Sequence, residues 1–106
     1  MTERSRLPNR RECEIFEFRC ENIKYTASVG RYPDGRVSEI FINNGKAGSS
    51  SETNARDAAI IASIALQHGV EVDTIRSSIS RASNGRALGP LGAVLDLLEN
   101  PDGKNG

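Results

Sequence analysis

Two loops of the sequence combine glycine, positive charge and a following helix, a combination that suits an anion. The first loop is NGKAGSSSET, residues 44–53, where Lys46 supplies charge and Gly48 permits close backbone approach. Ser49 and Ser50 add hydroxyl groups at the start of the helix. Helix N-termini present unpaired amides and the positive end of the helix dipole, which favours a bound phosphate. The loop lacks the spacing and β-α-β context of a Walker loop, and a serine cap behind a flexible turn explains the same residues equally well.

The second loop is RASNGRALGP, residues 81–90, which precedes the last predicted helix. Arg81 and Arg86 carry planar guanidinium groups, which suit phosphate or ribose oxygens. Asn84 lies between them and can make a polar contact with a base. A solvated loop is the plainer alternative for these residues.

A third candidate cluster lies beside the turn YPDG. We expect Arg31 to contribute to a site on a neighbouring subunit and Tyr32 to stack on a base, because every base presents a π-face. Surface charge beside a hairpin turn, and packing of the tyrosine against that turn, are the alternatives.

Nothing in the sequence groups residues for catalysis or metal binding. The one histidine, His68, lies in the last turn of a predicted helix, where it favours the helix dipole. Cys13 and Cys20 are seven residues apart, so on one strand they point to opposite faces, and we expect two buried thiols. We therefore expect a non-enzymatic protein without a metal or another cofactor.

Length and charge limit the other function classes. A chain of 106 residues supports one domain, and 14 basic against 14 acidic residues leave no overall field that would attract nucleic acid. No apolar stretch is long enough to cross a bilayer and no signal-peptide core is present, so we expect a cytoplasmic protein without membrane contact. We predict a basic arm at 1–11, a single domain at 12–99 and a frayed tail at 100–106.

Alternating hydrophobicity predicts strands in the first half of the chain. Phe16, Phe18 and Cys20 share one face of a first strand, and Glu21-Asn22 connects it to a second. Tyr25, Ala27 and Val29 define one face of the second strand. In the third, VSEIFIN, we expect Ile40 and Ile42 on one face and Val37 and Phe41 on the other.

Helical spacing follows the strands. We predict a helix from Ser50 to His68, begun by a capping box of Ser49 and Glu52 and ended by Gly69. The residues expected along its packed side are Ala58, Ile61, Ala62, Ala65 and Leu66. A shorter helix is expected to begin at a capping Asp73, and a last one near Pro90. Strands followed by helices predict an α+β domain, with an antiparallel sheet of three or more strands covered by two to three C-terminal helices.

The ordered series of motifs GRYPDGRVSEIFI, GKAGS, the helix ending in LQHGV, and NGRALGPLGAVLDLL resembles the TSCPD domain from about Lys24 to Leu98. This small domain occurs near the C-terminus of adenosylcobalamin-dependent ribonucleotide reductases and as free-standing proteins. The resemblance implies a ribonucleotide reductase as a partner. It does not transfer the family's cysteine-rich tail, because no cysteine follows Cys20, nor the activity of the absent catalytic barrel.

More distantly, the strand-rich first half and arginine-bearing loops are similar to phage Thoeris anti-defence sponge proteins. Those proteins bind cyclic ADP-ribose-type signals, and in some cases cyclic oligonucleotides, in pockets between subunits. The resemblance implies a homo-oligomer that sequesters a cyclic or phosphorylated nucleotide, while the first resemblance implies an accessory or regulatory module of a reductase. The expected ligand contacts are Arg31, Tyr32, Lys46, Gly48, Ser49, Ser50, Arg81, Asn84 and Arg86.

Overall fold

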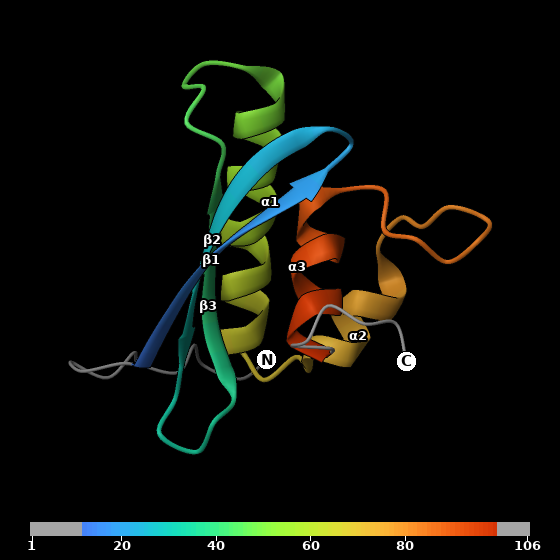
Figure 1. Ribbon diagram of the computed structural model, residues 1–106. Helices are drawn as coiled ribbons and strands as arrows, with labels where there is room; N and C mark the ends of the chain where they lie inside the picture. Colours follow the sequence, from blue (N-terminus) through green and yellow to red (C-terminus); the bar gives the residue numbers. More distant parts are fainter. Residues whose placement is uncertain (1–11, 100–106) are drawn as a thin grey trace.

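An antiparallel sheet of three strands forms the first half of the fold, and three helices follow it. The computed structural model describes residues 12–99, so the predicted arm and tail lie outside the described residues. In chain order the elements are β1 (Glu12–Cys20), β2 (Ile23–Arg31), β3 (Val37–Asn43), α1 (Ser50–Gln67), α2 (Val72–Ser78) and α3 (Pro90–Glu99). The sheet order is β1-β2-β3, and the helices lie on one side of the sheet (Figure 1). The predicted α+β class is confirmed.

The turn between β1 and β2 is the two-residue connection that the sequence predicts. Glu21 and Asn22 both have positive φ angles, 52° and 64°, which gives a turn whose twist matches that of the flanking strands. Cys20 then pairs with Ile23, and the register continues along the hairpin. This register places Phe18, Cys20 and Tyr25 in the core, as their alternation predicts.

Helix α1 packs against β3 through a side that matches the predicted one only in part. Ala55, Ala59, Ala62 and Leu66 are buried, whereas Ile61 is 68% exposed. The predicted side was therefore wrong at Ile61 and right at Ala62 and Leu66. Small alanines permit a close approach of α1 to the sheet, and the large isoleucines are left on the outer side of the helix.

Two polar residues on the inner side of α1 explain why its buried side differs from the predicted one. The hydroxyl of Ser63 accepts a hydrogen bond from the backbone amide of Ile40 at 2.8 Å, and the side-chain amide of Gln67 donates to the carbonyl of Ser38 at 2.8 Å. Ser63 and Gln67 are one helical turn apart, and Ser38 and Ile40 are two residues apart on β3. The helix thus satisfies backbone groups of a strand that lies at the edge of the sheet, where unpaired groups invite aggregation.

The face assigned to Val37 was also wrong. Val37 belongs to the hydrophobic core together with Ile40 and Ile42, while Phe41 is exposed. The cause is an irregularity in the pairing of β2 with β3: Gly30 pairs with Glu39 but Arg31 pairs with Val37, which leaves Ser38 as an extra residue. A bulge of this kind reverses the side on which the following residues point.

The helix ends agree with the prediction in part. Ser49 caps α1 by accepting from the Glu52 amide, and Gly69 has a φ of 93°. Glu52 does not complete the capping box, because its carboxylate accepts from Arg56 at 2.9 Å and the Ser49 amide donates to the Lys46 carbonyl. Helix α2 begins after Glu71 without a side-chain cap, so the capping role predicted for Asp73 was wrong.

Candidate functional site

The predicted ligand residues lie at three places in the fold. The loop with Lys46 joins β3 to α1 at the top of Figure 1, and the loop with Arg81 and Arg86 precedes α3 at the right. The turn that follows Arg31 lies at the bottom of the same view. The three clusters therefore do not form one pocket within a single chain.

The loop before α1 is ordered by its own hydrogen bonds. The side chain of Asn44 accepts from the Lys46 amide at 2.9 Å, and the Ser49 hydroxyl donates to the Lys46 carbonyl at 2.7 Å. Gly48 takes a φ of 85°, in the region that favours glycine, and Ser50 is exposed. The capping role of the serines is thus confirmed for Ser49, while contacts of Lys46, Gly48, Ser49 and Ser50 with phosphate stay a prediction.

Arg81 is engaged inside the protein. Its guanidinium contacts both carboxylate oxygens of Asp96, at 2.9 and 2.8 Å, and also donates to the carbonyls of Gly85 and Arg76. These hydrogen bonds from Arg81 lower the pKa of Asp96 below its ordinary value. A ligand at Arg81 would have to compete with this bidentate ion pair to Asp96. The main role of Arg81 in the structure is to hold the loop onto α3.

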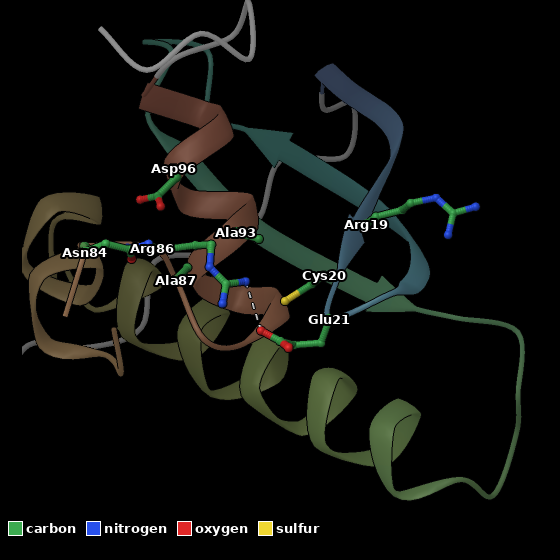
Figure 2. A pocket seen from close by; sticks show the side chains of 9 residues that line it. Arg19, Cys20, Glu21, Asn84, Arg86, Ala87, Ala93 and Asp96 are labelled. Carbon is green, nitrogen blue, oxygen red and sulfur yellow. Dashed lines mark hydrogen bonds and ion pairs between the residues drawn. The ribbon is translucent and has the colours of Figure 1, made fainter. Parts of the chain in front are cut away.

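Asn84 and Arg86 line a hollow of about 500 Å³ at the end of β1, together with Cys20 and Glu21 (Figure 2). Arg86 donates to the Glu21 carboxylate at 3.0 Å, and the Asn84 side chain accepts from the Arg86 amide at 2.9 Å. Burial raises the pKa of the Cys20 thiol, and the neighbouring Glu21 raises it further. Arg19 lines this hollow as well, so its lining holds two cations, Arg19 and Arg86, and two carboxylates, Glu21 and Asp96. The lining therefore has no surplus of positive charge that would favour an anion.

The third cluster is a packed turn. Arg31 donates to Glu14 at 2.9 Å and to the carbonyl of Gly35 at 2.8 Å. Tyr32 is buried, and the Arg36 guanidinium carbon lies 4.9 Å from the centre of its ring. Tyr32 therefore packs against its own turn, which was the alternative to a stacked base. The Arg36 guanidinium covers the ring where a base was expected to stack.

Two basic residues beside Lys46 were not among the predicted ligand contacts. Arg19 and Lys24 are partners across β1 and β2, and both line a hollow of about 430 Å³ that Lys46 also lines. Figure 2 shows Arg19 pointing away from Arg86 and Asp96, on the other side of β1. The signal was present in the sequence, because a hairpin turning at Glu21-Asn22 pairs residue 19 with residue 24.

The expectation of two buried thiols was half wrong. Cys20 is buried, but Cys13 is exposed, with its sulfur 3.1 Å from the Ser28 hydroxyl oxygen. Within residues 12–99, no group of three or more histidine, cysteine, aspartate or glutamate side chains could hold a metal ion. None of the helices in that range is long and apolar enough to cross a membrane.

The sequence of this domain matches a known protein family. The model of a family described as the TSCPD domain matches residues 3–99. The chain belongs to the TSCPD domain family. The match extends beyond both ends of the motif series that suggested it, and no solved structure matches this TSCPD domain significantly.

Three curated relatives of this TSCPD domain are named vitamin B12-dependent ribonucleotide reductase. The chain is 36% identical to the protein of Bradyrhizobium diazoefficiens over 73 residues, which are 69% of this chain and 6% of the relative. It is 35% identical to the protein of Agrobacterium fabrum over 71 residues, 67% of this chain and 6% of the relative. The protein of Rhodopirellula baltica is 35% identical over 77 residues, 73% of this chain and 7% of the relative. The TSCPD domain thus spans less than a tenth of the reductases that it matches.

Proposed function

We propose that this TSCPD domain is a non-catalytic accessory module that docks on a vitamin B12-dependent ribonucleotide reductase. The observation that carries the proposal is that more than two thirds of the chain is homologous to a segment built into three such reductases. A domain that shares a polypeptide with an enzyme is held near it at an effective concentration in the millimolar range, so a weak interface is enough. Docking without such a tether needs a stronger contact surface.

The outer side of α1 provides such a surface. Ile60, Ile61 and Ile64 are 44%, 68% and 39% exposed, and their spacing places them beside one another on the helix. Isoleucine is among the most often buried residues, and a contiguous exposed apolar patch marks an interaction site. The inner side of α1 already packs on β3 through alanines, so the isoleucines are free to contact a partner.

Binding to a purified reductase tests the proposal. The Bradyrhizobium diazoefficiens enzyme, with its own homologous segment deleted, offers the docking site that this domain is expected to occupy. We expect saturable binding at micromolar concentrations in biolayer interferometry, and weaker binding to the intact enzyme, whose own segment competes. No binding to the deleted enzyme at 100 µM, roughly the limit for a specific complex without a tether, would contradict docking.

A matched pair of variants tests the surface. Ile61→Asp is expected to weaken binding at least tenfold, because burying an isoleucine contributes about 1.5–3 kcal/mol and an unpaired carboxylate adds a cost. Ile15→Asp is the control, because Ile15 is 71% exposed on the open face of the sheet, away from α1. Loss of binding in the Ile15 variant alone would assign docking to the sheet and refute the role of α1.

Sequestration of a cyclic or phosphorylated nucleotide in a homo-oligomer is the second candidate. The observation that favours it is the group of basic side chains Arg19, Lys24 and Lys46 around one hollow. A sequestering protein binds its nucleotide without a reductase. Thermal-shift measurements with cyclic dinucleotides, cyclic trinucleotides and cyclic ADP-ribose isomers test it, because a ligand that binds only the folded state raises the melting temperature.

A further inference from the structure

A hollow at one end of the sheet collects positive charge from three separate segments. Arg19 on β1 and Lys24 on β2 are directly opposite each other in the ladder. Lys46 reaches the same hollow from the loop that follows β3, and the volume of this open hollow is about 430 Å³. This volume lies in the range of small-molecule sites.

The charge of this hollow is not balanced by neighbouring carboxylates. Among the residues that the structure describes, Glu17 is the one acidic residue that lines it, and its carboxylate lies 3.3 Å from the Lys24 ammonium group. Neither Arg19 nor Lys46 forms an ion pair within residues 12–99. The arginines at the other candidate clusters differ, because each lies within 3.0 Å of a carboxylate: Arg31 with Glu14, Arg36 with Asp34, Arg81 with Asp96 and Arg86 with Glu21. Three cations against one carboxylate leave a surplus of two positive charges at this hollow.

The polar groups around the cations suit an anion with several oxygens. Asn22 and Asn43 line the hollow with exposed side-chain amides, which can donate hydrogen bonds. Asn44 has a different role: its oxygen accepts from the Lys46 amide and its nitrogen donates to the Ser51 hydroxyl at 2.9 Å. These two bonds fix the start of the loop that presents Lys46, so part of the site is organised before a ligand arrives.

We propose that this hollow binds the polyphosphate group of a nucleoside di- or triphosphate, through Arg19, Lys24 and Lys46. Three cations on three segments match a chain of phosphates better than a single one, and arginine can contact two phosphate oxygens at once. A small ligand is favoured over single-stranded nucleic acid, because none of the described side chains that line the hollow is aromatic and could stack on successive bases. This site is independent of reductase docking, and it would be the part of the fold that binds a nucleotide.

Isothermal titration with inorganic tripolyphosphate, ATP and adenosine tests the site. We expect both phosphate compounds to bind, adenosine not to bind, and the affinity to fall as salt is added, since exposed charges are screened. Binding of adenosine as strong as that of ATP would overturn the assignment to phosphate. Single-stranded DNA that binds more tightly than tripolyphosphate would overturn the assignment to a small ligand.

Charge variants locate the site. Each lost cation near the phosphates is expected to weaken binding about fivefold, so Arg19→Gln combined with Lys46→Gln weakens it about 25-fold. Arg36→Gln removes the same charge from an exposed side chain at the β2–β3 turn and should leave the affinity unchanged. An unchanged affinity in the double variant, or an equal loss in the Arg36 control, would refute the site.

Glu17→Gln gives a test that misfolding cannot imitate. It removes the one carboxylate of the hollow and releases Lys24 from its ion pair, so tripolyphosphate affinity should rise about fivefold. A fall or no change in affinity would contradict the proposed position of the phosphates. Failure of tripolyphosphate to bind would refute this phosphate site alone. The proposal of reductase docking is tested by a separate binding experiment that contains no phosphate ligand.

Discussion

Replacement of Ser63 by alanine should lower the free energy of unfolding by about 2 kcal/mol. The Ser63 hydroxyl accepts from the Ile40 amide at 2.8 Å, and Ser63 and Ile40 are only 7% and 0% exposed. Removing the hydroxyl leaves a buried amide without its partner, which costs about 1–3 kcal/mol. The higher helix propensity of alanine offsets a few tenths of a kcal/mol at most. The loss is therefore larger than a surface substitution causes.

Urea unfolding followed by circular dichroism measures this effect. With a slope of about 1–2 kcal/mol/M for a small domain, the midpoint should fall by roughly 1–2 M. Ser77→Ala is the matched control, because Ser77 is exposed on α2 and its hydroxyl contacts only the Thr74 carbonyl of the same helix, at 3.2 Å. If the two variants differ by less than about 0.5 kcal/mol, Ser63 does not support the edge of the sheet as described.

Two further substitutions test the region around α3. Asp96→Asn should lower the melting temperature at pH 7 more than Asp34→Asn does in the exposed turn, because it removes the partner of Arg81. Arg81 lowers the pKa of Asp96 below 3.8, so the advantage of the native protein is present above that pH and is lost as the pH falls through the lower folded-state pKa. If the melting temperature of the native protein exceeds that of Asp96→Asn by the same amount from pH 7 down to about pH 2, this linkage is wrong. Gly92→Ala should destabilise by about 1–3 kcal/mol in urea, because a Cβ there would lie 2.8 Å from the Cβ of Ala87. Gly89→Ala meets nothing within 4 Å and should be near neutral; equal effects of the two would refute the packing argument.

The local elements of this fold could be predicted because local patterns determine them. Alternation in β1 and β2, the Glu21-Asn22 turn and the cap at Ser49 all depend on residues a few positions apart. The inner side of α1 could not be predicted from apolar spacing, because Ser63 and Gln67 are drawn inward by backbone groups of a distant strand. The bulge that turns Val37 into the core likewise depends on its pairing with β2.

The candidate site was predictable only in part, for the same physical reason. Lys46 stood out through its glycine-rich loop, but the carboxylates that pair with Arg31, Arg81 and Arg86 lie 15 to 65 residues away along the chain. Glu21, for example, is 65 residues away from Arg86. Arg19 and Lys24 could have been paired from the hairpin register, yet their meeting with Lys46 requires the third strand to be placed beside the second.

Native mass spectrometry of the protein purified from its own cells distinguishes the two proposed roles most directly. We expect an assembly that contains this TSCPD domain together with a ribonucleotide reductase polypeptide, and that loses the reductase when Ile61→Asp is introduced. A homo-oligomer that retains a cyclic nucleotide and contains no reductase would contradict docking and establish sequestration instead.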